Sequence, residues 1–150
     1  MAIFRRFSPN LSSAFWLVIL IMIWSAFAPI QAGGMASYVM IIGNSMEPGF
    51  HLGDLVITHR QVTYSVGDAV VYRNVDLKNY VFHRIVSQDS SHFTLRGDNN
   101  SFADTYRPIP QEVLGKLWLR LPRGGTYLQM MRNPLVMALI AAGLGGLLTI

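Results

Sequence analysis

The chain of 150 residues contains no cysteine, and charged side chains occupy only 13% of its positions. Without cysteine there is no disulfide, no thiolate metal ligand and no cysteine nucleophile. Soluble domains carry a charge at about a quarter of their positions, whereas 51% of this chain is hydrophobic. Part of the apolar content is therefore expected to face lipid. The same composition excludes a disordered chain, because disorder requires low hydrophobicity.

A concentrated excess of positive charge is also missing from most of the chain. The formal net charge is +4, and Arg5 and Arg6 supply two of the positive charges. The other basic residues are scattered and nearly balanced by the eight acidic ones, so they form no stripe that could follow a phosphate backbone. We expect no nucleic-acid partner. The four histidines lack a metal-ligand spacing, and neither a metal nor a cofactor is expected.

An uncharged run near the N-terminus predicts contact with a bilayer. No charged side chain occurs from Phe7 to Met46, and the apolar stretch Ala14 to Ile30 approaches the length that crosses the hydrocarbon core. Arg5 and Arg6 precede this stretch, and the positive-inside tendency keeps them in the cytoplasm and sends the residues that follow across the membrane. The alternative is a cleavable secretory signal that ends near Ile30-Gln31-Ala32.

A second uncharged run, Asn133 to Ile150, ends the chain. It is short for a span, but its glycines and alanines suit close helix packing in lipid. We expect a C-terminal transmembrane helix, with a membrane-surface hairpin as the alternative. The predicted organisation is a cytoplasmic tip and anchor over 1–32, an extracytoplasmic domain over 33–132, and a membrane-spanning or membrane-associated helix over 133–150.

The residues between these runs are rich in short alternating or β-branched segments, separated by Gly, Pro, Asn and Asp turns. No amphipathic helix of useful length is expected within 35–132. The prediction is a mostly β fold, a compact antiparallel domain that is barrel-like because closure removes exposed strand edges. The expected strands are Tyr38–Ile42, Leu55–Thr58, Ala69–Arg73, Tyr80–Gln88, Phe93–Arg96 and Val113–Leu121.

Ser45 directly follows the first expected strand, in Gly43-Asn44-Ser45-Met46-Glu47-Pro48. A strand that breaks into a turn can expose a hydroxyl and leave neighbouring backbone N–H groups unpaired, which are two ingredients of an acyl-transfer site. Taken alone, a serine before a Pro-Gly turn is more often ordinary turn chemistry.

His83 falls within an expected strand, where alternation places it on one face with Val81 and Ile85. A histidine on an apolar face is either a hydrogen-bonded core residue or a general base. Two carboxylates, Asp98 and Asp104, follow in a polar segment where they either close a turn or orient such a base. With Ser45, these residues supply a nucleophile, a base and an orienting acid, the set that serine catalysis uses.

In combination, these segments resemble the type I signal peptidases, in the branch represented by archaeal and endoplasmic reticulum enzymes. The resemblance covers Val39 to about Leu117 and the preceding anchor. It is carried by the motifs G-N-S-M-E-P-G-F with H-L-G-D-L-V over 43–56, V-G-D-A-V-V-Y over 66–72, V-F-H-R-I-V over 81–86, and R-G-D-N-N with a later aspartate over 96–104.

The resemblance implies a role for each matching residue. Ser45 would be the nucleophile, His83 the general base in place of the lysine of the common bacterial branch, and Asp104 the carboxylate that orients the imidazole. Asp98 matches a second acidic position associated with that site. Many relatives have a serine two residues before the nucleophile, where this chain has Gly43, so a side-chain hydroxyl donor to the oxyanion hole is not implied at this position.

The function implied by the resemblance is a membrane-bound serine endopeptidase that removes signal peptides from exported preproteins. Its partners would be preprotein signal peptides and the lipid bilayer, with membrane-protein subunits in some lineages and none in others. The implied location is the prokaryotic cell membrane, or the endoplasmic reticulum membrane in a eukaryote, with the catalytic domain extracytoplasmic or lumenal. Two alternatives are a related protease specialised for pilin or matrix substrates and a catalytically inactive β module that binds export partners.

Overall fold

The computed structural model describes residues 9–147, which form two units, one up to Ala36 and the other from Ser37. Arg5 and Arg6, which were expected to set the orientation in a membrane, lie outside the described residues, as does the end of the second uncharged run. The division predicted at 32/33 and 132/133 stays a prediction.

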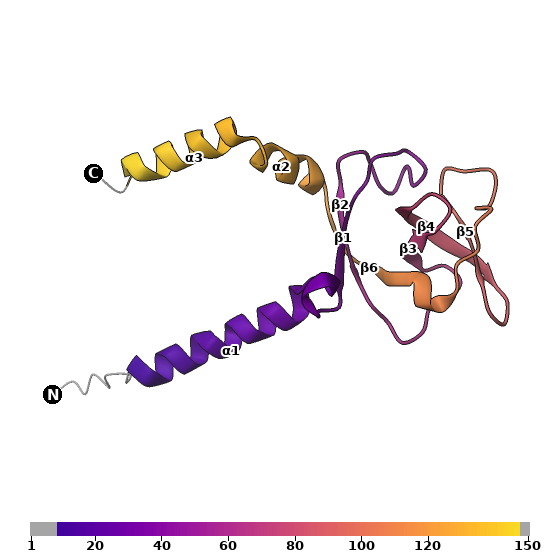
Figure 1. The fold of residues 1–150 in the computed structure, drawn as a ribbon, viewed down its shortest axis with the longest axis horizontal. Coiled ribbons are helices and arrows are strands. Elements are labelled where there is room, and N and C mark those ends of the chain that lie inside the picture. Colours follow the sequence, from indigo (N-terminus) through magenta and orange to yellow (C-terminus); the bar gives the residue numbers. More distant parts are fainter. Residues whose placement is uncertain (1–8, 148–150) are drawn as a thin grey trace. The chain divides into compact units, whose positions relative to one another are not determined.

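The first unit is built around helix α1, Pro9–Phe27, followed by a short 3-10 helix, Ile30–Ala32 (Figure 1). The helix stops before Pro29, because proline restricts the preceding residue and has no N–H to donate. The chain then doubles back, and the Ala36 N–H donates to the Ala28 carbonyl. A side chain at Gly34 would collide with that carbonyl, with its Cβ only 2.0 Å from the oxygen, so this reversal requires glycine.

The surface of α1 is apolar all around its middle. Nine of its large hydrophobic side chains are half exposed or more in this unit, and no charge lies among them. A helix that is hydrophobic on every side has no preferred face to bury in a globular core. These side chains are Phe15, Trp16, Leu17, Val18, Leu20, Ile21, Met22, Ile23 and Trp24.

The second unit contains one six-stranded sheet with the order β1-β2-β6-β3-β4-β5. Four neighbouring pairs are antiparallel, namely β2 with β6, β6 with β3, β3 with β4 and β4 with β5. The six expected strands are all found, with ends that differ by at most two residues. Their bounds are β1 Ala36–Met40, β2 Leu55–His59, β3 Ala69–Asn74, β4 Asn79–Gln88, β5 Phe93–Arg96 and β6 Val113–Leu121, the last preceded by a 3-10 helix at Pro110–Glu112.

The central strand β3 is buried on both faces. Ala69 and Val71 belong to one hydrophobic cluster, and Val70 and Tyr72 belong to the other. The first cluster also joins Ile41, just after β1, to Phe82 on β4, although three strands lie between β1 and β4 in the sheet. The sheet must therefore curve around this cluster.

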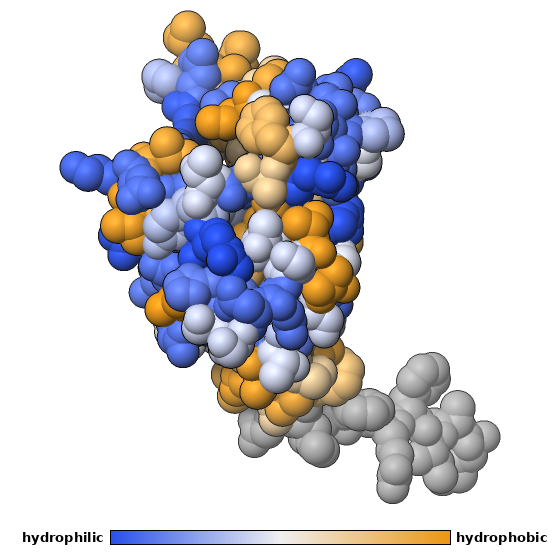
Figure 2. Space-filling view, turned by 90° about the vertical axis from the view of Figure 1, so that its right-hand side faces the viewer, coloured by the Kyte–Doolittle hydropathy of each residue, from blue (hydrophilic) through white to orange (hydrophobic). Residues whose placement is uncertain are grey.

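The prediction of a mostly β, antiparallel domain is confirmed for these strands. The barrel-like closure is not found, because the described strand order runs from β1 to β5 without pairing these two. Curvature brings distant strands into one core, but the sheet keeps two edges. The face of this unit in Figure 2 is largely hydrophilic, with hydrophobic side chains in separate small groups.

The chain after β6 forms two helices, α2 Gly124–Met131 and α3 Pro134–Leu147 (Figure 1). Helix α2 was not expected from the sequence, because it opens with two glycines, which are poor helix formers. Those glycines allow close packing on the sheet. A Cβ at Gly125 would lie 2.3 Å from Met40, and one at Gly124 would lie 2.9 Å from Leu55.

Within residues 9–147, no helix combines the length and the apolar character needed to cross a bilayer. The transmembrane helices expected over 14–30 and 133–150 are therefore not found as such.

Candidate active site

Ser45 lies in the loop that connects β1 to β2, and its neighbours fix the turn. The next residue, Met46, is only 1% exposed and packs into the first core cluster. On the other side, the Asn99 N–H donates to the Ser45 carbonyl at 2.8 Å. A Cβ at Gly97 would lie 2.5 Å from that carbonyl oxygen, so only glycine lets the loop after β5 approach so closely. The turn is held between the core and this loop.

His83 points from β4 toward this turn. It is paired across the sheet with Val70, and 8% of its surface is exposed. Its Nε2 lies 3.0 Å from Ser45 Oγ. The alternation of β4 explains the direction, because Arg84 next along the strand points to the other face.

Asp104 reaches the other side of the imidazole from the loop after β5. Its backbone N–H donates to the Leu95 carbonyl, which anchors the loop to β5. Its Oδ2 lies 2.7 Å from His83 Nδ1, and both side chains are about nine-tenths buried. An ionised carboxylate can only accept hydrogen bonds, so the proton of a neutral His83 belongs on Nδ1. Nε2 is then left as the acceptor for the Ser45 hydroxyl.

Asp98 makes a different interaction. Its two carboxylate oxygens accept hydrogen bonds from Arg84 Nε at 2.8 Å and Nη2 at 2.6 Å. Arg84 also donates to the Gly67 carbonyl, so the pair links the loop after β5 to β4 and to the turn before β3. The structure thus brings three of the four predicted site residues, Ser45, His83 and Asp104, into one hydrogen-bonded line, and it places Asp98 in a neighbouring clamp.

Two further groups lie next to the hydrogen-bonded line of Ser45, His83 and Asp104. Neither was predicted from the sequence. The Tyr72 hydroxyl donates to Asp104 Oδ2 at 2.9 Å. Burial, and then the negative charge of Asp104, raise the pKa of Tyr72, so that its proton stays in place. The signal was present in the sequence, since a tyrosine inside a buried strand needs a hydrogen-bond partner for its hydroxyl.

The second group clamps the far end of the Ser45 loop. Asp54, which is 2% exposed, accepts hydrogen bonds from the His51 and Arg123 N–H groups and from Arg120 Nε at 2.7 Å. Arg120 also donates to the Gly49 carbonyl. Burial alone would raise the pKa of Asp54, but these hydrogen bonds outweigh it and hold the pKa below its usual value. Through this clamp β6 fixes the loop that carries Ser45.

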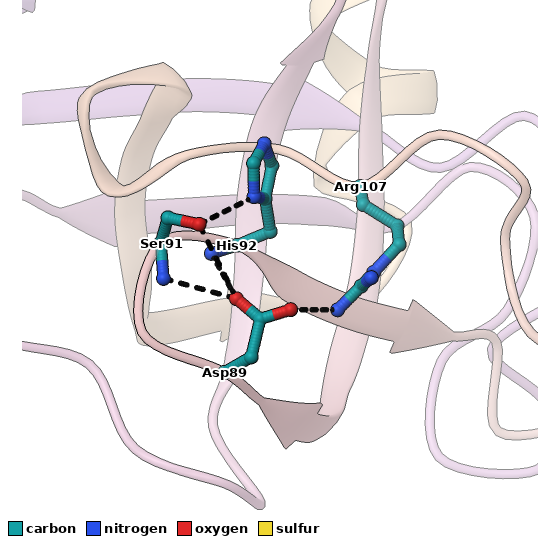
Figure 3. Close-up of polar contacts among 4 residues, drawn as sticks. All are labelled: Asp89, Ser91, His92 and Arg107. Carbon is teal, nitrogen blue, oxygen red and sulfur yellow. Dashed lines mark hydrogen bonds and ion pairs between the residues drawn. The ribbon is translucent and has the colours of Figure 1, made fainter.

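Within the described residues, a second group combines the same residue types in a different geometry (Figure 3). Ser91 Oγ lies 2.8 Å from His92 Nδ1, but Asp89 accepts from the Ser91 and His92 backbone N–H groups and from Arg107. The carboxylate therefore closes a turn and touches no ring nitrogen of His92. This exposed group lacks the order of serine, imidazole and carboxylate that is seen at Ser45.

A cavity of about 180 Å³ opens beside Ser45. Its walls are residues 39–43 at the end of β1 and after it, Ser45 and Met46, and residues 80–83 of β4. The Ser45 N–H makes no hydrogen bond within the described part of the chain, and a Cβ at Gly43 would meet nothing within 4 Å. A reacting carbonyl therefore has space next to the hydroxyl and one free backbone donor.

Comparison with known proteins places the chain in a family. Peptidase S24-like proteins match residues 21–117, well over half of the chain. The chain therefore belongs to the Peptidase S24-like family.

Two relatives are signal peptidase complex catalytic subunits named SEC11. The one from Plasmodium falciparum is 32% identical over 89 residues, which cover 56% of this chain and 48% of the relative. The one from Saccharomyces cerevisiae is 34% identical over 89 residues, covering 55% of this chain and 53% of the relative. These relatives confirm the resemblance to signal peptidases that the motifs indicated, and this chain spans about half of their length.

Proposed function

We propose that the protein is a serine endopeptidase that cleaves signal peptides from exported preproteins, with Ser45 as nucleophile, His83 as general base and Asp104 as the carboxylate that orients the base. The observation that carries the proposal is the line from Ser45 Oγ to His83 Nε2 at 3.0 Å and from His83 Nδ1 to Asp104 at 2.7 Å. These distances are those that a nucleophile, its base and an orienting group require.

The chemistry follows from the hydrogen-bond directions. His83 Nε2 accepts the proton of Ser45 as Oγ attacks the substrate carbonyl, and the free Ser45 N–H stabilises the oxyanion that develops. The imidazolium then gives its proton to the leaving amine, which leaves an acyl group on Ser45. Water attacks this ester, with His83 again taking a proton, and the hydroxyl is restored. Asp104 stabilises the imidazolium in both halves of the reaction.

The cavity beside Ser45 supports a peptide substrate with small side chains. An extended peptide can pair with β1, which is the end strand of the described sheet. Its side chains would then enter the space between residues 39–43 and β4. We infer that small residues such as alanine are preferred next to the scissile bond, as the resemblance to signal peptidases also implies.

The exposed surface of α1 supports attachment to lipid. Nine apolar side chains between Phe15 and Trp24 are half exposed or more, and burying such a surface in a bilayer is favourable. We propose that α1 holds the peptidase at a membrane, with the β unit on the extracytoplasmic or lumenal side where signal peptides emerge. Because the relatives are named as subunits of a complex, we also propose that membrane-protein partners bind this chain.

The test is cleavage of a preprotein by the purified full chain in detergent or lipid vesicles. The wild type should cut a preprotein with alanine next to the scissile bond, and Ser45→Ala and His83→Ala should each abolish cleavage. Ser91→Ala and His92→Ala are the matched controls, because they alter the same residue types in the second group and should leave cleavage unchanged. Equal cleavage by the wild type and Ser45→Ala would overturn the proposal.

A serine-directed covalent probe distinguishes this function from that of an inactive binding module. A peptidase should be labelled at Ser45 and lose the label in His83→Ala, since the imidazole activates the hydroxyl. A binding module should not react there at all.

A further inference from the structure

Tyr72 is a buried residue at the centre of the sheet, and its hydroxyl forms a hydrogen bond with Asp104. It is 1% exposed and stands on β3 between Val81 of β4 and Val113 of β6. A buried phenol hydroxyl needs a hydrogen-bond partner. It donates to Asp104 Oδ2, the same oxygen that accepts from His83 Nδ1. One carboxylate oxygen therefore joins the tyrosine to the histidine.

The ring of Tyr72 is held by residues that do not touch the serine, histidine and aspartate line. It stacks on Tyr106, with the ring planes 2° apart and the centroids 6.3 Å apart. The Tyr106 hydroxyl in turn donates to Glu112 Oε1 at 2.6 Å, and Glu112 Oε2 accepts from the Ile109 N–H. The hydroxyl that meets Asp104 is therefore presented by a fixed ring.

Resting on the proposed function, we propose that Tyr72 is a positioning residue that sets how strongly Asp104 holds the protonated form of His83. A donor on Oδ2 draws negative charge away from the oxygen that faces the imidazole. The carboxylate then stabilises the imidazolium less. The same hydrogen bond fixes the direction in which Asp104 points.

The other charged groups on the surrounding elements are occupied elsewhere. Arg84 of β4 pairs with Asp98, and Lys116 of β6 pairs with Asp68 before β3. The exposed side chains of Arg73 on β3 and Arg96 on β5 point to solvent. The titratable groups in direct contact with the His83–Asp104 pair within the described residues are Ser45 and Tyr72.

The experiment is the pH dependence of kcat/KM for Tyr72→Phe in the full chain. Phenylalanine keeps the buried ring and its stacking but removes the donor. The acid limb should move to higher pH by about half a unit or more, because the imidazolium is then held more strongly, and kcat should fall more than KM changes. Tyr64→Phe is the matched control. It removes the hydroxyl of another buried tyrosine, which accepts from the Gln61 N–H and does not touch Asp104, and its acid limb should match the wild type.

Site-specific replacement of Tyr72 by 3-fluorotyrosine tests the proposal without removing any contact. The fluorinated phenol is a stronger donor, so the acid limb should move to lower pH. An acid limb unchanged in both Tyr72 variants, with cleavage still dependent on Ser45, would overturn the role of Tyr72 alone. Cleavage that persists in Ser45→Ala would instead overturn the proposed function on which it rests.

Discussion

At the scale of single residues, the role proposed for Asp104 requires its negative charge, which a close isostere lacks. In Asp104→Asn the side chain keeps its shape but loses the charge that faces Nδ1. An amide that donates to Nδ1 favours the tautomer with the proton on Nε2, which cannot accept from Ser45. In a serine triad, this change costs about 10⁴-fold in kcat, and we expect a loss of that order in preprotein cleavage. The measurement is kcat under saturating substrate.

Two aspartates elsewhere serve as controls for this change. Asp98→Asn removes the charge of the Arg84 clamp, and Asp89→Asn removes the charge of the exposed turn. Neither carboxylate touches the imidazole, so both variants should keep kcat within a small factor of the wild type. A loss in Asp98→Asn as large as that in Asp104→Asn would show that the wrong carboxylate had been assigned.

The residue pattern alone predicts which types of residue make the site, whereas the choice of Asp104 over Asp98 rests on the resemblance to signal peptidases. The alternation of β4 places His83 and Arg84 on opposite faces, and this is what the structure has. Asp98 and Asp104 share one loop, and the position of each depends on contacts with residues far away in sequence. Arg84 and Gly67 hold Asp98, whereas Leu95 anchors Asp104. No local pattern encodes those contacts.

At the scale of secondary-structure elements, the clamp between Asp54 and Arg120 determines how firmly the Ser45 loop is attached to β6. Removing the carboxylate leaves the hydrogen-bond donors of His51, Arg123 and Arg120 without their ionised acceptor. A hydrogen bond to a charged group contributes about 1.5–3 kcal/mol. Because Arg120 is 31% exposed and can find water, we expect Asp54→Asn to lower the free energy of unfolding by about 2 kcal/mol at pH 7.

This loss should depend on pH in a direction fixed by the lowered pKa of Asp54. Folding favours the ionised carboxylate, so its contribution is complete above the ordinary value of 3.8 and disappears as pH falls through the lower folded value. The difference between the wild type and Asp54→Asn, measured by urea unfolding, should therefore shrink below about pH 4. Asp76→Asn, at an exposed turn, is the control and should change little at any pH. A difference that stays constant with pH would contradict the role of the charge.

The elements that the sequence missed are those set by long-range packing. The six strands follow from alternation and turn residues, but α2 begins at Gly124 and Gly125, where local propensity opposes a helix. It forms because those glycines fit against Leu55 and Met40. The curvature of the sheet is likewise a property of the whole core, since Ile41 and Phe82 meet across several strands. Neither feature has a signature within a short window of sequence.

At the scale of the whole molecule, the β unit and α1 expose different kinds of surface. This difference fits the proposed division of roles, with cleavage by the β unit and attachment to lipid by α1. The face of the β unit shown in Figure 2 mixes hydrophilic residues with small hydrophobic groups, whereas the middle of α1 exposes nine large apolar side chains between Phe15 and Trp24. If α1 holds the protein at a bilayer, enzyme and membrane-embedded substrate meet in two dimensions. Their effective concentration rises without any change in the active site.

This division predicts a selective defect when α1 is made polar. In the triple variant Leu20→Gln, Ile21→Gln and Trp24→Gln the helix keeps good helix formers but loses apolar area, so less of the protein should float with lipid vesicles. Cleavage of a preprotein embedded in vesicles should fall about tenfold or more, while cleavage of a short water-soluble peptide should stay near the wild-type rate.

The matched control changes three exposed apolar residues of the β unit, Val62→Gln, Val66→Gln and Leu77→Gln. This control replaces the same number of exposed apolar side chains, but away from α1. It should float with lipid vesicles and cleave the embedded preprotein as the wild type does. Some binding should survive in the α1 variant, because Leu135 and Leu139 of α3 are also exposed. If the α1 variant binds vesicles as fully as the control, the attachment to lipid lies elsewhere in the molecule, and the advantage in cleaving embedded substrates cannot come from this helix.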